Sequence, residues 1–481
     1  MKRSGASTAM VAALFIVGLL IGAVGVYAAT SSSAKTTTVT GPGVTETSTV
    51  ATTETVGAGV TVTSVSTATQ VSTVTTTLQG TAPSLGTVTI GVLTDLSDGL
   101  SSEGVRVQAY TEQAVSDVNA WVQNTSWAGK VTFKVDVEDY ALNPTTADTE
   151  LKSMAASGIS VVVGPLNSGA AEAILSDADS LHVVLVSPSS TSPALAIPST
   201  PGNPSYLFRT APDDRYQGQA DATEMYGQGV RGLIIVYRDD TYGDGLYNYT
   251  SLDFGNAGGS GVTIDAIPYS STATSFTNIL PTISSDYNAL VAKYGANAVA
   301  IDAISFEEIG YLLQEASTQY PSLLSTPQPW YGTDGEQGDT NLVNSTYGAF
   351  MQDIRMPATV FGYDNTSKTA QICADFASNP SLSCDSYALG SYDDVWLAAL
   401  SVLDCGANSG PCIQKVFASV ADSYFGATGW TQLTVGQDRL GGNFQIWCVE
   451  SPPAGENWYL CGSWSSLTNT IAWVPGQQPS T

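Results

Sequence analysis

Two apolar segments of the chain each run directly into a short loop of small, uncharged polar residues. Residues 159–163 (ISVVV) lead into the loop 164–169 (GPLNSG), and residues 183–186 (VVLV) lead into the loop 187–193 (SPSSTSP). Hydroxyl groups, together with the free N–H groups of a helix that begins near Ser168, are suited to hold a small polar or anionic group by hydrogen bonds. Neither loop carries a general base or a metal ligand. The chemistry indicated is therefore binding rather than catalysis.

The two loops can form one site only if the elements before them lie side by side. Residues 170–180, between the apolar runs, are rich in Ala and Leu with acidic residues on the outer side, and this predicts a helix. Strand, helix and strand then form a βαβ unit, whose uninterrupted apolar strands are typical of a parallel sheet covered on both faces. In such sheets ligands bind beyond the carboxyl ends of the strands, where both loops lie.

The same alternation continues through most of the chain. The expected strands are residues 88–93, 131–137, 159–163, 183–186, 232–237, 262–267, 298–301 and 329–331. The expected helices are a segment ending at residue 122, residues 145–156 and 170–180, a segment starting at residue 245, and residues 283–294 and 306–316. Residues 206–210 (YLFRT) separate two such series, so the expected fold class is α/β, with two lobes on parallel-sheet cores.

Composition and motifs exclude several classes of function. The chain has 481 residues and a formal net charge of −27, whereas nucleic acids and anionic lipids require basic patches. There is no Gly-x-Ser-x-Gly motif, and the single histidine, His182, precedes a buried strand and is a poor general base. Residues 242–245 (YGDG) lack the last glycine of a dinucleotide loop, and the acidic loop 334–339 lacks EF-hand spacing. We expect no enzyme, no cofactor, no metal and no nucleic-acid partner.

The amino-terminal segment indicates export. Lys2 and Arg3 precede an apolar stretch at residues 9–29, which at 1.5 Å per helical residue is about long enough to cross a ~30 Å bilayer. The basic end stays in the cytoplasm, so the chain after residue 30 is expected on the extracellular face of the membrane. A cleaved signal sequence is the alternative. Residues 31–86 are rich in Ser and Thr and predict a disordered stalk, which separates residues 1–30 from the folded part.

The cysteines also fit an exported protein. All 6 lie in the last quarter of the chain, and the simplest of the possible disulfide schemes joins nearest neighbours. The expected pairs are Cys373–Cys384, Cys405–Cys412 and Cys448–Cys461. Asn-x-Ser/Thr sequons begin at residues 124, 248, 344 and 365, which indicates an exposed and glycosylated surface.

Several short motifs, in this order, resemble the extracellular solute-binding proteins of branched-chain amino acid ABC transporters, the Leu/Ile/Val-binding family of type I periplasmic binding proteins. They lie between residues 88 and 447: VGPLNSG (163–169), VSPSSTSP (186–193), FRT (208–210), YGDG (242–245), GTDG (332–335), YDDV (392–395), GATG (426–429) and GGNF (441–444). The resemblance implies two Rossmann-like lobes joined by a three-segment hinge. Lobe 1 would comprise residues 87–210 and 351–440, and lobe 2 residues 211–350 and 441–475.

The resemblance also implies partners and a site. Permease and ATPase subunits of an ABC transporter would receive the solute, an amino acid held between closing lobes. In the family the ligand carboxylate binds the two polar loops, which corresponds to Ser168, Ser189 and Thr191 here. The ammonium group meets an acidic residue that corresponds to Asp334, and an aromatic residue that corresponds to Tyr242 closes over the ligand.

Two departures from the family concern specificity. Glu103 stands where the family usually has an aromatic residue, and residues 302–305 (DAIS), with Ser305, replace aromatic or glycine-rich residues. Carboxylates there would suit a polar or cationic ligand side chain better than an aliphatic one. Alternative roles remain for single residues, because Ser and Thr often cap helices and Asp334 lies in a turn-like Thr-Asp-Gly sequence. The alternative function is a receptor ectodomain that senses an amide, urea or amino acid through a separate signalling partner.

Overall fold

The computed structural model describes residues 83–479, except for residues 201, 203 and 450–456, together with four short strands between residues 39 and 64. The chain divides into two compact units, residues 1–80 and 81–481. In the first unit, β1 (Val39–Gly41) pairs with β2 (Val44–Glu46), and β3 (Thr52–Val56) pairs with β4 (Val60–Ser64), both antiparallel.

These two hairpins fall within the segment that was expected to be disordered. Thr and Val, which make up most of it, favour extended backbone, so short antiparallel pairing is compatible with the composition. The expected membrane span, residues 9–29, lies outside the described residues. Within the described part of the chain, no helix combines the length and apolar character needed to cross a membrane.

The first lobe is built on a five-stranded parallel sheet in the order β6-β5-β7-β8-β9. Its strands are β5 (Gly86–Thr94), β6 (Val131–Asp139), β7 (Val161–Val163), β8 (Val184–Ser187) and β9 (Leu207–Arg209). Every residue of β7 and β8 is buried. Val161 and Val163 belong to one core cluster and Val162 to another, as expected for a sheet with helices on both faces.

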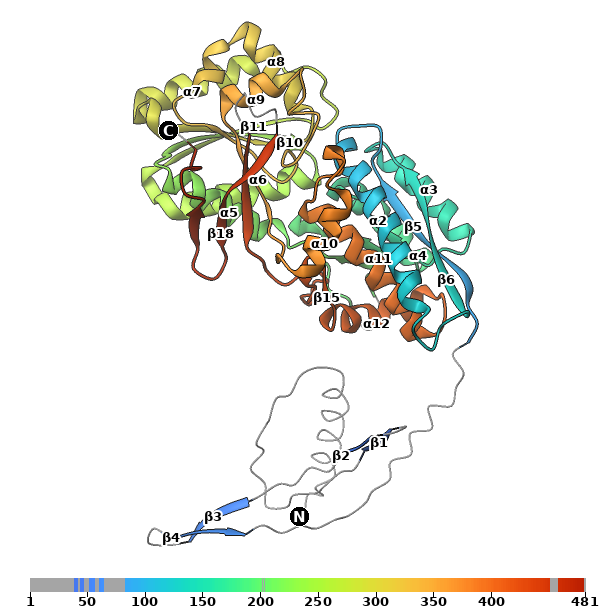
Figure 1. Ribbon diagram of the computed structural model, residues 1–481. Helices are drawn as coiled ribbons and strands as arrows, with labels where there is room; N and C mark the ends of the chain where they lie inside the picture. Colours follow the sequence, from blue (N-terminus) through green and yellow to red (C-terminus); the bar gives the residue numbers. More distant parts are fainter. Residues whose placement is uncertain are drawn as a thin grey trace. The chain divides into compact units, whose positions relative to one another are not determined.

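Helices from two separate stretches of sequence cover this sheet (Figure 1). The first stretch supplies α2 (Ser101–Val122), α3 (Pro144–Ala156) and α4 (Ser168–Leu181), and the second supplies α10 (Ser367–Phe376), α11 (Ser386–Cys405) and α12 (Gly410–Asp422). The second stretch ends in a small antiparallel pair, β15 (Phe425–Gly426) with β16 (Gly429–Trp430). Helices α2 and α11 contribute to the same core cluster, so the hydrophobic core of the first lobe is complete only after the chain returns to that lobe.

The second lobe starts with a four-stranded parallel sheet in the order β11-β10-β12-β13. Its strands are β10 (Gly232–Asp239), β11 (Thr263–Ser270), β12 (Val299–Ile304) and β13 (Trp330–Tyr331). Its helices are α5 (Asp214–Gly227), α6 (Thr241–Gly258), α7 (Leu280–Tyr294), α8 (Ile309–Gln319) and α9 (Gly348–Ile354). The short 3-10 turns are Pro193–Leu195 in the first stretch, Gly259–Gly261, Ala296–Ala298 and Pro321–Ser325 in the second lobe, and Pro380–Leu382 before α11.

An antiparallel sheet extends this lobe. Strands β14 (Pro357–Phe361), β17 (Phe444–Val449), β18 (Trp458–Ser465) and β19 (Thr470–Trp473) pair in that order. The Gly332 N–H donates to the carbonyl of Pro357 at 2.9 Å, and Gly332 forms a bridge with Ala358, which joins this sheet to the end of β13.

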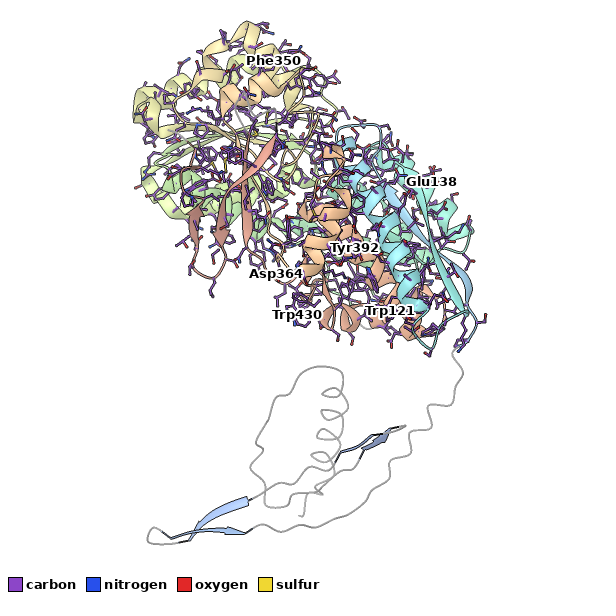
Figure 2. All side chains as sticks on the ribbon, viewed as in Figure 1. Trp121, Glu138, Phe350, Asp364, Tyr392 and Trp430 are labelled. Atoms are coloured by element: carbon purple, nitrogen blue, oxygen red, sulfur yellow. A yellow bond between two sulfur atoms is a disulfide. The ribbon has the colours of Figure 1, made fainter. Side chains whose placement is uncertain are left out.

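The position of β14 bears on the border between the lobes. Strand β14 pairs with β17 of the second lobe. The first helix or strand after β14 that packs on the core of the first lobe is α10, through Ile372. Figure 2 places Phe350 at the helical end of the second lobe and Tyr392 among the helices of the first. We therefore propose that the chain returns to the first lobe near Gly362 rather than near Phe350, because β14 completes a sheet edge before the chain leaves.

The three disulfides expected from the cysteine spacing are present. They join Cys373 to Cys384, Cys405 to Cys412, and Cys448 to Cys461. The first links α10 to the segment before α11, the second links α11 to α12, and the third links β17 to β18. The nearest-neighbour scheme is thus confirmed.

Candidate ligand-binding site

A narrow cavity of about 30 Å³ lies between the two lobes. The first lobe contributes the start of α2, the loop before α4, the loop after β8 and the start of α11. The second lobe contributes the start of α6 and the loops that follow β12 and β13. The lining residues are Leu100, Ser102, Glu103, Arg106, Leu166, Asn167, Ser168, Ser189 and Tyr387 from the first lobe, and Tyr242, Phe306, Asp334, Gly335, Gln337 and Asp339 from the second.

The loop between β5 and α2 brings Glu103 to the cavity. The Asp95 carboxylate accepts the backbone N–H groups of Asp98 and Leu100 at 3.0 and 2.7 Å and so folds this loop into a tight turn. Burial raises the pKa of Asp95 to about 6. At Gly104 a Cβ atom would lie 1.5 Å from the carbonyl oxygen of Asp95. Only glycine permits this approach, which sets the start of α2 against the end of β5.

The hydroxyl groups of the two polar loops tie the loops to each other. The Ser187 hydroxyl donates to the carbonyl of Pro165 at 2.6 Å, and the Ser189 hydroxyl donates to the carbonyl of Leu166 at 2.9 Å. Their hydrogens are therefore already engaged within the first lobe. Ser189 lines the cavity, but it offers a ligand only its oxygen lone pairs.

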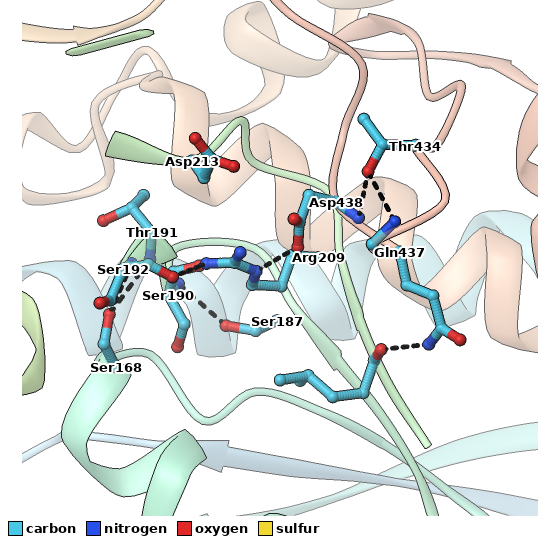
Figure 3. A network of polar contacts seen from close by, with 12 residues as sticks. Ser168, Ser187, Ser190, Thr191, Ser192, Arg209, Asp213, Thr434, Gln437 and Asp438 are labelled. Atoms are coloured by element: carbon cyan, nitrogen blue, oxygen red, sulfur yellow. Dashed lines mark hydrogen bonds and ion pairs between the residues drawn. The ribbon is translucent and has the colours of Figure 1, made fainter. Parts of the chain in front are cut away.

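Ser168 differs from Ser187 and Ser189, because its hydroxyl acts only as an acceptor in the bonds of the described residues. It accepts the N–H groups of Thr191 and Ser192 at 3.2 and 3.1 Å, which leaves its own hydrogen for a group in the cavity (Figure 3). Ser168 is also the first residue of α4, whose N-cap residue Asn167 makes no side-chain capping bond. The hydroxyl and the helix N-terminus together favour an acceptor or an anion at this wall.

A buried arginine at the hinge fixes the second loop from behind. Arg209 pairs through Nε with Asp438 at 2.6 Å, and its Nη1 donates to the carbonyls of Ser190 and Ser192 at 3.0 and 2.7 Å (Figure 3). Both charged side chains are almost fully buried. The loop that orients Ser168 is thus held by a segment that joins the lobes.

Asp334 stands on the wall contributed by the second lobe and is surrounded by neutral donors. Its carboxylate accepts the hydroxyl of Tyr242 at 2.7 Å, the amide of Gln217 at 2.9 Å, and the hydroxyl of Tyr387, which comes from the first lobe. Burial raises the pKa of Asp334 above its ordinary value. No cation of the chain pairs with it among the described residues, so this wall favours a positively charged group.

Acidic side chains also gather where α2 meets the second lobe. Arg106 donates to Glu103 at 2.7 Å and pairs with Asp385 at 2.5 Å. Asp339 faces them from the second lobe and accepts the Ser102 hydroxyl at 2.9 Å. Burial, followed by the charge of Asp385, raises the pKa of Glu103 to about 7. Burial, followed by the charge of Glu307, raises the pKa of Asp339 to about 8.

Direct bonds between the lobes show that the cavity is closed. Arg106 donates to the carbonyl of Gly338 at 2.9 Å. Glu307 of the second lobe accepts the Ser101 hydroxyl and the Ser102 N–H at 3.2 and 3.3 Å. Helix α2 has no side-chain cap of its own at Leu100, so a carboxylate from the opposite lobe supplies one.

The structure brings together five of the seven residues expected at the site. Ser168, Ser189, Tyr242, Asp334 and Glu103 all line the one cavity.

Thr191 and Ser305 do not line the cavity. The N–H of Thr191 is bound to Ser168 and its side chain faces the buried Asp214 carboxyl. Ser305 donates through its N–H at 2.8 Å and through its hydroxyl to Glu336, a contact inside the second lobe. Both hydroxyl-bearing residues thus stabilise the loops behind the site.

Sequence reasoning missed Arg106, Tyr387, Gln337 and Asp339, which all line the cavity. Arg106 could have been found, because it lies three residues after Glu103, a spacing that permits an ion pair on a helix. The expected helix, however, began only after Gly104. Tyr387 gave no such signal, because it reaches the cavity only when α11 packs beside α2.

Two lobes with parallel-sheet cores around a closed cavity define the class of type I periplasmic binding proteins. The family model named "Receptor family ligand binding region" matches residues 106–449, and the chain belongs to this family.

Curated relatives include an uncharacterised protein of Methanocaldococcus jannaschii, 28% identical over 412 residues, which are 83% of this chain and 94% of that protein. The substrate-binding protein of a chemotactic signal transduction system in Halobacterium salinarum is 25% identical over 63% of this chain and 74% of its own length. A glutamate receptor of Arabidopsis thaliana matches at 30% identity over 27% of this chain and 14% of that receptor.

Solved structures share the fold. A leucine-binding protein of Thermotoga maritima superposes with a TM-score of 0.64 at 16% identity, covering 77% of this chain and 97% of that one. The branched-chain amino acid transporter substrate-binding protein of Streptococcus pneumoniae, solved with isoleucine, superposes with a TM-score of 0.59 at 20% identity, covering 78% and 99%. The two-lobe fold expected from the sequence is confirmed.

Proposed function

We propose that the chain is the extracellular solute-binding component of an ABC importer and that it captures an amino acid or a similar small polar solute between its lobes. The observation that carries this proposal is the opposition of Ser168, at the start of α4, to Asp334 across one cavity. An α-amino acid presents a carboxylate and an ammonium group a short distance apart, which complements these two walls. The site supports a binding role rather than a catalytic one.

Capture requires the lobes to open and close, and the contacts of the site support such a motion. The Tyr387 hydroxyl of the first lobe and the Tyr242 hydroxyl of the second both bind Asp334. A ligand that engages Asp334 and Ser168 together adds bonds that exist only in the closed state, and therefore favours closure.

The partners follow from this role. The closed protein would deliver its solute to permease and ATPase subunits; structural neighbours from Streptococcus pneumoniae and Desulfitobacterium hafniense are substrate-binding proteins of transporters. The disulfides and the sequons are compatible with the extracellular face of the membrane, with anchoring through residues 9–29 or secretion after cleavage. Asn124, Asn248 and Asn365 are exposed, as glycosylation would require.

A sensory role is the second candidate. It is supported by the matches to a chemotactic substrate-binding protein and to a glutamate receptor. The ligand site would be the same, but the closed protein would contact a separate transmembrane signalling protein instead of a permease. Deleting the gene and measuring both uptake and taxis toward the bound solute separates the two roles.

Titration calorimetry tests the proposed ligand class. The full chain is titrated with a panel of amino acids, short amides and sugars, and the best ligand is then measured with Asp334→Asn and with the exposed control Asp353→Asn in the same lobe. Loss of the Asp334 charge proposed to face the ammonium group should cost about 2 kcal/mol or more, roughly thirtyfold in affinity. The control should bind as the wild type does. A best ligand without an amine, or unchanged affinity in Asp334→Asn, would contradict the proposal.

A further inference from the structure

The side of the cavity formed by α2 carries more negative than positive side chains. Among the described residues that line the cavity, the acids are Glu103, Asp334 and Asp339, and the one cationic side chain is Arg106. An amino acid with an uncharged side chain has no net charge and would leave this excess uncompensated. This excess of negative charge in the cavity therefore bears on the charge of the ligand side chain.

Arg106 cannot provide the missing charge, because its guanidinium is already used. Its Nη2 is bound to Glu103, its Nε is paired with Asp385, and its Nη1 donates to the carbonyl of Gly338. Arg106 is 1% exposed, so water does not share these bonds. When both carboxyls are ionised, Glu103 and Asp385 together outweigh the charge of Arg106. Asp339 adds a further negative charge.

Glu103 retains an acceptor that nothing in the chain satisfies. Its Oε2 binds Arg106, while its Oε1 is buried without a hydrogen-bond partner, and the residue is only 8% exposed. A buried carboxylate oxygen without a donor costs free energy comparable to a lost charged hydrogen bond. Asp339, 4% exposed, accepts only the Ser102 hydroxyl and the Asn341 N–H and faces no cation of its own.

We propose that the ligand carries a second positively charged group, on its side chain, and that Glu103 and Asp339 select for it. The ligand class is then an amino acid with a cationic side chain, such as a diamino acid. This inference rests on the proposed function and names its substrate class. Arg106 acts as a positioning residue, since its bond to Oε2 leaves Oε1 of Glu103 for the ligand.

The titration behaviour of the group supports this assignment. The raised pKa values of Glu103 and Asp339, about 7 and about 8, mean that burial makes ionisation of these carboxyls costly. The charged groups that face them are Arg106 on α2, Asp385 before α11, and Glu307 from the second lobe. A ligand cation would favour the ionised forms, so its binding should release protons near neutral pH.

Matched ligand pairs test the inference on the full chain. Lysine is compared with norleucine, and ornithine with norvaline, by titration calorimetry with a chelator present so that no divalent cation takes part. The cationic member of at least one pair should bind about tenfold more tightly or better. Binding measured in two buffers of different ionisation enthalpy should reveal proton release for the cationic ligand only.

Substitutions locate the preference. Glu103→Gln, which keeps the size of the side chain, should remove most of the preference within a pair, and Asp339→Asn should reduce it. Glu112→Gln makes the same change at an exposed position of the same helix and should leave the preference unchanged. The thermal midpoint of each variant establishes that it is folded, so a loss of preference is assigned to the site.

The outcomes separate this inference from the proposed function. If neither lysine nor ornithine binds more tightly than its uncharged partner, or if Glu103→Gln retains the full preference, the inference is wrong while the amino-acid function stands. If uncharged ligands bind tightly only after a divalent cation is added, an inorganic ion occupies the acidic side and the inference is again wrong. If no amino acid binds at all, the proposed function itself fails.

Discussion

The hinge and the cavity use acidic side chains in opposite ways. At the hinge, Asp438 is paired with Arg209 inside the protein, and the Asp393 carboxylate accepts the N–H groups of Ala427 and Thr428 and the Thr428 hydroxyl. Among the described residues that line the cavity, by contrast, three acids share one cation, Arg106. These hinge acids are thus bound by a cation or by donors of the chain, whereas the cavity acids leave capacity for a positively charged ligand.

A third group of acids shows that burial alone does not mark a ligand site. Asp302 on β12 and Asp221 and Glu224 on α5 are buried away from the cavity. Burial, followed by the charge of Asp302, raises the pKa of Glu224 to about 8, and burial raises the pKa of Asp302 to about 7. Burial favours the protonated forms of these acids, and none of the three lines the cavity between the lobes.

The largest effect is expected from breaking the compensated pair at the hinge. Arg209→Gln leaves Asp438 buried without its cation, which should lower the free energy of unfolding by about 3–5 kcal/mol in urea denaturation. The control Arg215→Gln removes a half-exposed arginine from its pair with Asp213 and should cost about 1 kcal/mol or less. Equal losses in the two variants would show that the hinge pair has no special role.

The second prediction concerns pH and the uncompensated acids. Four buried carboxyls, Glu103, Glu224, Asp302 and Asp339, have pKa values raised to about 7 or 8 in the folded protein, above those of an unfolded chain. Between about pH 4 and pH 8 the folded state therefore binds more protons than the unfolded chain, and the free energy of unfolding should fall as pH rises.

Urea denaturation of the ligand-free protein at pH 5 and pH 8 measures this slope. If the free energy of unfolding instead rises over this interval, these carboxyls are ionised and paired with cations in the folded protein. The contrast between cavity and hinge would then be wrong. Repeating the measurement with a saturating cationic ligand should flatten the slope, since the ligand supplies the charge that Glu103 and Asp339 lack.

The third prediction separates two serines of the same wall. Ser168→Ala removes a hydroxyl whose hydrogen is free and whose oxygen holds the Thr191 and Ser192 N–H groups, and should weaken binding of the best amino acid by about tenfold. Ser189→Ala removes a hydroxyl that already donates to the carbonyl of Leu166 and should weaken binding less. Calorimetry that ranks the two variants in reverse order would refute the assignment of the donor.

The smallest effect is expected at the contact that caps α2 from the opposite lobe. Glu307 does not line the cavity, yet it accepts the Ser101 hydroxyl and the Ser102 N–H only when the lobes are closed. Glu307→Gln should therefore weaken ligand binding by about 0.5–2 kcal/mol, the usual worth of a helix cap, mainly by faster dissociation. Stopped-flow dissociation rates measure this, with Glu112→Gln as the control.

Eight of the nine strands that the structure describes in the two parallel sheets could be predicted from the sequence, because uninterrupted apolar runs such as Val161–Val163 are what a doubly covered parallel sheet requires. Helix α5 could not be predicted in this way. The face that it buries carries Asp214, Gln217, Asp221 and Glu224, so it lacks the apolar stripe of an ordinary surface helix. Tertiary packing of α5 against α6 and the antiparallel sheet of the second lobe, rather than a local sequence pattern, determines that helix.

The sequence placed residues at the cavity where chain topology positions them and missed residues that packing positions. Ser168 and Ser189 follow β7 and β8, whose carboxyl ends meet at one edge of the same sheet, whereas Asp334 was expected from the family resemblance. Tyr387 reaches the cavity only because α11, far along the chain, packs beside α2. Ser305 has a suitable side chain, but its hydroxyl donates to Glu336, and no sequence pattern predicts this hydrogen bond.

A crystal structure of the full chain with its best-binding amino acid tests the central claim most directly. The ligand carboxylate should lie within hydrogen-bond distance of the Ser168 hydroxyl at the start of α4, and its ammonium group should contact the Asp334 carboxylate, with both lobes closed around it. A ligand that binds outside this cavity, or that lies within it with no amine on Asp334, would contradict the account.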